Sequence, residues 1–174
     1  MPIISWSMKS SKSLITVRDI ALFGVLGGLT FAAKLVMSGL PNIEPVSLMV
    51  MLFAVVFGWK GLYPTYVFVV MEILFYGIGG WAAYYLYIWL VLFVAAKLMA
   101  EMKHPLGWAI LSGAFGLLFG ALCAILDAFV GGIGYAVTKW ASGIIFDLAH
   151  CGGNFVIALV LFVPLRKLFA KLNR

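Results

Sequence analysis

Charge is what this chain most lacks. Only 10% of its 174 residues are Asp, Glu, Lys or Arg, while 65% are hydrophobic and the mean hydropathy is +1.14. A soluble domain typically has about 25% charged residues. A chain with so little charge does not cover a water-facing surface, so we expect an integral membrane protein.

Motifs for several kinds of chemistry are also missing. No GxxxxGK[ST] is present, so the chain does not bind ATP in the P-loop manner, and neither HExxH nor CxxC occurs. The two cysteines, Cys123 and Cys151, lie in apolar segments, which favours buried free thiols over a disulfide. The net charge of +6 does not indicate a groove for nucleic acid, because the basic residues lie at the ends of apolar runs. These absences exclude the commonest catalytic and nucleotide-binding sites.

Long apolar runs are present instead, and the breaks between them predict six membrane spans. A span needs about 20 apolar residues at a rise of about 1.5 Å each. No small-residue cleavage site follows the first run, so it is expected to stay as a helix. The expected spans are 19–40, 46–59, 62–79, 82–100, 106–128 and 141–165, separated by breaks at 41–45, 58–61, 77–81, 101–105 and 131–139.

The predicted fold class is an all-α integral membrane protein with a single six-helix bundle. The bundle covers 19–168, with a cytoplasmic N-terminal segment at 1–18 and a cytoplasmic tail at 169–174. Cytoplasmic loops carry an excess of Lys and Arg. If the N-terminus is cytoplasmic, the outer side receives only Lys139, and the inner side receives ten basic residues: Lys9, Lys12, Arg18, Lys60, Lys97, Lys103, Arg166, Lys167, Lys171 and Arg174.

Ionisable residues inside the spans predict a polar pocket. Such residues are costly in hydrocarbon and usually face an interior cavity or pair with one another. By helical rise, all of them fall in the outer half of the membrane: Lys34, Glu72, Asp147 and His150. His150 shares one helical face with Asp147 and Asn154, which are three residues before it and four after it. We expect a pocket that opens outward and is closed below; the alternative is a self-satisfied cluster in which Lys34 pairs with Glu72 or Asp147.

Aromatic residues gather at the same outer rim. Those nearest the expected pocket are Tyr76, Trp81, Tyr84 and Tyr85. Some of them belong to an interfacial aromatic belt, which is common in membrane proteins. The surplus at the outer rim favours a large ligand with planar parts. Two glycine runs, at 77–80 and 131–134, predict turns that could serve as lids.

Two stripes of small residues recur at intervals of four. The first comprises Gly24, Gly28 and Ala32, and the second comprises Gly116, Gly120, Ala124 and Ala128. Such stripes let helices approach closely in lipid. Each stripe is either an internal packing face or a docking face for a partner, and the pattern does not choose between them.

Four segments resemble one family. They are LPNIEPVSL at 40–48, YGIGGW at 76–81, YLYIW at 85–89 and FDLAHCGGNF at 146–155. Together with six expected helices and the first small-residue stripe, they are similar to the S components of energy-coupling factor (ECF) transporters. The resemblance covers about residues 18–168 and is closest to the cobalamin-specific branch.

The resemblance implies a binding subunit and not an enzyme. S components bind a vitamin from outside a prokaryotic cell membrane and join a transmembrane coupling subunit and two ATPase subunits, with no permanently bound cofactor or metal. The S component is thought to topple in the membrane to deliver its ligand. A helix-one motif with alanine at every fourth position meets the coupling subunit; its matching positions here are Gly24, Gly28 and Ala32, with glycine at two of them.

The expected ligand is cobalamin or a corrinoid precursor such as cobinamide. Corrin amides suit Asn42, Glu44, Asp147, His150 and Asn154, and the corrin faces suit Tyr and Trp. Pro41 and Pro45 stiffen the loop that holds Asn42 and Glu44.

Several alternatives remain open. Another vitamin (folate, pantothenate or a queuosine precursor) is one of them. An intramembrane enzyme using Glu72, Asp147 and His150 is another. A metal site at Asp147 and His150 lacks a third and a fourth ligand.

Overall fold

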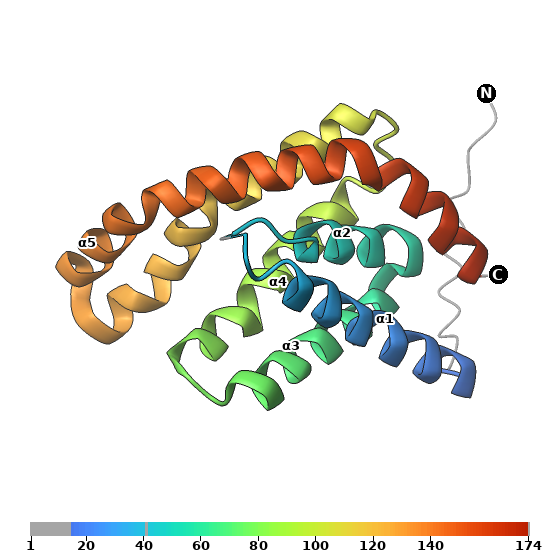
Figure 1. Ribbon diagram of the computed structural model, residues 1–174, viewed down its shortest axis with the longest axis horizontal. Helices are drawn as coiled ribbons and strands as arrows, with labels where there is room; N and C mark the ends of the chain where they lie inside the picture. The colour runs from blue at the N-terminus through green and yellow to red at the C-terminus, as the bar shows by residue number, and fades with distance from the viewer. Residues whose placement is uncertain (1–14, 41, 174) are drawn as a thin grey trace, which may run out of the picture.

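The computed structural model describes residues 15–40 and 42–173, and within them the chain forms helices joined by short turns (Figure 1). The elements are α1 (Val17–Val36), α2 (Val46–Phe57), the 3-10 turn η1 (Gly58–Gly61), α3 (Leu62–Tyr76), α4 (Gly80–Leu98) and α5 (Pro105–Leu172). No strand occurs in the described part of the chain. The predicted all-α class is confirmed there; Pro41, Lys9, Lys12 and Arg174 lie outside the described residues.

Four described stretches are long and apolar enough to cross a membrane: Val17–Val36, Val46–Tyr76, Gly80–Leu98 and Pro105–Leu172. The structure is therefore compatible with a membrane-embedded protein. Helices α2 and α3 have only 12 and 15 residues, each shorter than the roughly 20 that a straight span needs. Length and composition alone therefore do not establish six crossings.

Helix α5 bends back on itself at one residue. Gly132 has φ 82° and ψ 168° and is the only residue inside α5 with non-helical angles. Figure 1 shows the two long arms of α5 meeting at one edge of the molecule. The expected nine-residue break at 131–139 is wrong, because a single glycine with positive φ reverses the chain and the helix resumes at once. Helix α5 continues to Leu172, into the segment expected as the C-terminal tail.

Small residues let the two arms of α5 pack closely. A Cβ on Gly116 would lie 2.8 Å from the carbonyl carbon of His150, and one on Gly113 would lie 3.3 Å from the carbonyl oxygen of Cys151. Further from the turn, the rings of Trp108 and Phe162 stack at 4.3 Å between centroids. The predicted stripe that contains Gly116 therefore contributes to packing within the bundle.

Helix α2 forms the centre of the core. Every residue from Val46 to Ala54 is buried, and α2 contacts both α4 and α5. Helix α1 lies along α3, where Phe23 stacks on Tyr63. A helix that is almost entirely apolar and buried needs a cover of other helices on all sides.

Several of the described basic residues lie together at one end of the bundle. The Arg18 side chain, near the start of α1, donates to the Leu172 carbonyl at 3.0 Å. Lys60 of η1 lies 2.9 Å from Asp19, and Arg166 donates to the carbonyls of the turn before α5 at 3.5 Å. The start of α1, η1 and the end of α5 therefore lie together. Lys34, about 24 Å further along α1 at 1.5 Å per residue, lies toward the opposite end.

Candidate functional site

Lys34 is the centre of the polar site. Its ammonium nitrogen, on α1, lies 2.6 Å from Glu72 Oε2 on α3 and 3.0 Å from Tyr85 Oη on α4. Glu44 Oε2, in the loop before α2, lies 3.9 Å from the same nitrogen. The contact between Lys34 and Glu72 is one of the two pairings considered under the alternative of a self-satisfied cluster. One lysine thus links three helices and a loop.

Two cavities adjoin this lysine and share Lys34, Tyr76 and Tyr85 in their walls. One has a volume of about 290 Å³ and the other about 430 Å³. Eight of the eleven residues that the sequence predicts as ligand-binding line one or both cavities: Lys34, Asn42, Glu44, Glu72, Tyr76, Trp81, Tyr85 and His150. The smaller cavity is completed by Met37, Ser38, Leu40, Ile43 and Phe119.

Described residues of the loop between α1 and α2 form one wall of the smaller cavity. Asn42 has a positive φ of 57°, a conformation that asparagine adopts more readily than most residues. Its Nδ2 donates to the Phe146 carbonyl of α5 at 3.1 Å. Ile43 packs against α5 where Gly153 leaves room, since a Cβ on Gly153 would lie 3.0 Å from Ile43 Cγ1. The loop is thus fastened to the second arm of α5 by one hydrogen bond and one apolar contact.

Several polar atoms of this site lack a hydrogen-bond partner. Burial raises the pKa of the Glu44 carboxyl, against the lowering effect of Lys34, and nearby Glu72 raises it further. Within the described part of the chain no hydrogen-bond donor reaches the Glu44 carboxylate. Glu72 Oε1 and His150 Nε2 are fully buried and have no partner there. The site is therefore incomplete as a hydrogen-bonding unit.

Three predicted ligand residues lie outside these two cavities. Asn154 is buried and donates to Ser47 Oγ at 2.9 Å, which ties α5 to α2. Asp147 Oδ1 accepts from the Gly120 amide at 3.0 Å, between the two arms of α5. Tyr84 bonds Asp127 instead. Although Asp147, His150 and Asn154 are all buried on one face, only His150 reaches the cavity.

The cluster around Asp127 was missed by the sequence analysis. Lys139 Nζ lies 2.7 Å from Asp127 Oδ1 and 2.8 Å from Tyr84 Oη. The cluster joins α4 to both arms of α5 near the Gly132 turn. Its signal was a carboxylate near the end of an apolar run with a lysine twelve residues later, but the expected loop at 131–139 separated the two.

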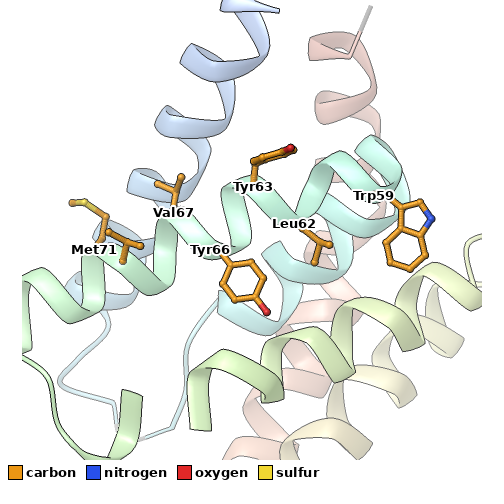
Figure 2. A pocket seen from close by; sticks show the side chains of 7 residues that line it. Trp59, Leu62, Tyr63, Tyr66, Val67 and Met71 are labelled. Carbon is orange, nitrogen blue, oxygen red and sulfur yellow. The ribbon is translucent and has the colours of Figure 1, made fainter. Parts of the chain in front are cut away.

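An apolar groove lies along η1 and α3. It has a volume of about 630 Å³ and is lined by η1 and α3 alone: Trp59, Leu62, Tyr63, Tyr66, Val67, Val70 and Met71. Figure 2 shows these side chains along one helix, with Tyr66 directed toward α4, where its hydroxyl donates to the Leu86 carbonyl at 2.7 Å. No charged side chain lines this groove, so it suits apolar contact and not recognition of a polar ligand.

Among the described residues no group of three or more His, Cys, Asp or Glu side chains could hold a metal ion. Comparisons with models of protein families, with curated proteins and with solved structures find no match to this chain.

Proposed function

We propose that this chain is the substrate-binding S component of an ECF-type importer, which takes up a vitamin from the outer side. One observation carries the proposal. Polar residues from α1, α3, α4, α5 and the first loop converge on adjoining cavities at the end of the bundle opposite the basic helix ends. A binding subunit needs such a one-sided site, because it captures its ligand from one compartment.

The topology that suits this role has six crossings with both ends of the chain in the cytoplasm. Helices α1 and α4 each make one crossing. Helices α2 and α3, joined by η1, make two short ones, and the arms of α5 before and after Gly132 make the last two. Lys60 and the end of α5 then lie on the inner side, in accord with the excess of basic residues expected there.

The cavities do not continue toward the cytoplasmic end. The buried rings of Phe68 and Trp89 lie next to Tyr85, and no described residue of the basic helix ends lines either cavity. A carrier that alternates its access around a fixed site usually places that site near the midplane between repeats. Delivery from a blind outer site requires movement of the whole chain, as the toppling expected for S components provides.

A partner-facing stripe on α1 agrees with this role. A Cβ added to Gly24 or Gly28 would meet nothing within 4 Å, and Ala32 is exposed. Gly27, between them, is the glycine that packs inward, against Val67 of α3. The face bearing Gly24, Gly28 and Ala32 is therefore open to the coupling subunit, and the two partner ATPases supply the ATP hydrolysis.

Cobalamin or a corrinoid precursor remains the first candidate ligand. Tyr76, Trp81 and Tyr85 offer aromatic faces to a planar ring, and Asn42 and Glu44 suit its amides. A corrin ring with its amide arms is larger than either cavity, so its entry requires the first loop to move. Folate and pantothenate carry carboxylates, which would meet Glu44 and Glu72 and fit less well than a queuosine precursor. For the enzymatic alternative, Asp147 lies outside the cavities that hold Glu72 and His150.

The decisive experiment is ATP-dependent uptake of labelled cobalamin into proteoliposomes that contain this chain, the coupling subunit and the two ATPases. Uptake that requires both ATP and this chain would establish the function and the ligand together. A fully assembled, ATP-hydrolysing complex without uptake would exclude cobalamin. Failure of the chain to join the coupling subunit would contradict the S-component role itself. Vesicles that lack only this chain are the control.

A further inference from the structure

The cavities around Lys34 carry an unbalanced set of charges. Two carboxylates, Glu44 and Glu72, face a single ammonium group. Lys34 contacts Glu72 closely, at 2.6 Å, and Glu44 only loosely, at 3.9 Å. One carboxyl group, that of Glu44, is therefore left without a close cationic partner in a site that is largely removed from water.

The hydrogen bonds are unbalanced in the same direction. The Lys34 ammonium group donates two of its three N–H groups, one to Glu72 Oε2 and one to Tyr85 Oη. Glu72 Oε1 is fully buried without a donor, and the Glu44 carboxylate receives none from the described residues. His150 Nε2 is also buried and unpartnered in the same cavity wall, but an imidazole nitrogen can donate or accept, so it does not add to the count of acceptors. Unpaired buried acceptors cost free energy, and a ligand that donates to them recovers it.

We propose that the ligand presents a cationic nitrogen group, an ammonium or an amidinium, to Glu44 and Glu72. Such a group supplies the missing positive charge and several N–H donors at once, and bonds to an ionised acceptor are about twice as strong as neutral ones. Tyr76, Trp81 and Tyr85 stand around the same position, and aromatic faces also attract cations. This inference rests on the proposed function only in taking these cavities as the ligand site, and it favours a ligand other than cobalamin, whose rim amides are neutral.

Three small probes of the same heavy-atom framework test the charge directly: benzamidine, which is cationic, benzamide, which is neutral, and benzoate, which is anionic. Binding is measured on the full-length purified chain, without partner subunits, as the rise in melting temperature with probe concentration. We expect benzamidine to bind more tightly than benzamide, and benzoate to bind least. Glu44→Gln should weaken benzamidine at least about tenfold, because it removes one partner of a desolvated charge pair. Glu101→Gln, a carboxylate in the exposed turn between α4 and α5, is the matched control and should change nothing.

Three results would each overturn the inference: benzamide matching benzamidine, benzoate binding as well as either, or no probe binding at all. Benzamidine binding that survives Glu44→Gln would also overturn it. The probe series on the native chain decides the matter even if Glu44→Gln does not fold. Because these probes need no coupling module, failed uptake with a clear preference for the cation contradicts only the proposed function. Successful uptake without that preference contradicts only this inference.

Discussion

Lys34 holds its site together through unequal contacts. Its partner Glu72 is 3% exposed at the side chain, whereas Lys34 itself is 20% exposed. A carboxylate so deeply placed depends on its cation, because a buried charge left unpaired costs several kcal/mol. Removing one partner of the pair is therefore expected to destabilise the fold more than replacing both partners by apolar side chains.

Lys34→Met should lower the free energy of unfolding by about 3 kcal/mol, because Glu72 Oε2 loses its ammonium partner. The double variant Lys34→Met/Glu72→Met should recover most of that loss, since it replaces the pair with apolar side chains of similar volume. Thermal unfolding of the two purified variants in the same detergent measures both effects. A single variant as stable as the native chain would show that the pair contributes nothing to stability.

At the scale of helices, the two small-residue stripes have different surroundings. Gly24 and Gly28 on α1 face open space, while Gly116 on α5 faces the backbone at His150. The sequence pattern is the same in both. Their roles differ because only the second stripe is covered by another part of the chain.

Substitution by leucine should separate the two stripes. Gly24→Leu and Gly28→Leu should leave folding unchanged but reduce co-purification with the coupling subunit, because they add bulk to the proposed docking face. Gly116→Leu should prevent correct folding, since its side chain would enter the backbone of the second α5 arm. Size-exclusion profiles of the free chain and pull-down with the coupling subunit are the two measurements. Unimpaired assembly of both α1 variants would remove this face from the partner interface.

The first loop is a second element whose movement can be tested. A Cβ on Gly153 would lie 3.3 Å from the Cβ of Ile43, close to the roughly 3.5–4.5 Å found across a disulfide. In a chain with Cys123 and Cys151 changed to alanine, Ile43→Cys/Gly153→Cys should form a bond that locks the loop shut. We expect the oxidised form to lose cobalamin capture and a reducing agent to restore it.

The single variant Ile43→Cys, in the same background, is the control for this pair and should capture ligand in either redox state. Equal capture by the oxidised and reduced double variant would mean that the ligand enters without opening the loop.

For the whole molecule, the number of crossings is the property that the helix lengths leave undecided. The six-crossing proposal places Ser38, Gly79 and Val130 outside and Lys103 and Lys171 inside, and all five positions are exposed. Single cysteines at these positions, again with the native cysteines removed, should react with an impermeant reagent on whole cells only at the first three. Labelling of Val130→Cys from the inner side would show that the turn of α5 does not reach the outer surface.

Composition and periodicity were sufficient for the coarse description of this chain. The low content of charged residues is a property of the sequence that folding does not change. The prediction of apolar helices therefore needed no tertiary information, and it is confirmed for the described residues. The expected gathering of basic residues at one end follows from the same reasoning, because each helix end is marked locally by its own Lys or Arg.

The packed helices decided what local patterns could not. Asp147 and Asn154 share a face with His150, yet only His150 reaches a cavity, because Gly120 and Ser47 of other segments bond the first two. The expected loop at 131–139 gave way to a turn at Gly132, and this brought Lys139 to Asp127. Which polar residue meets a cavity and which meets a neighbour depends on the partner that packing places opposite it, and that partner is usually distant in the sequence.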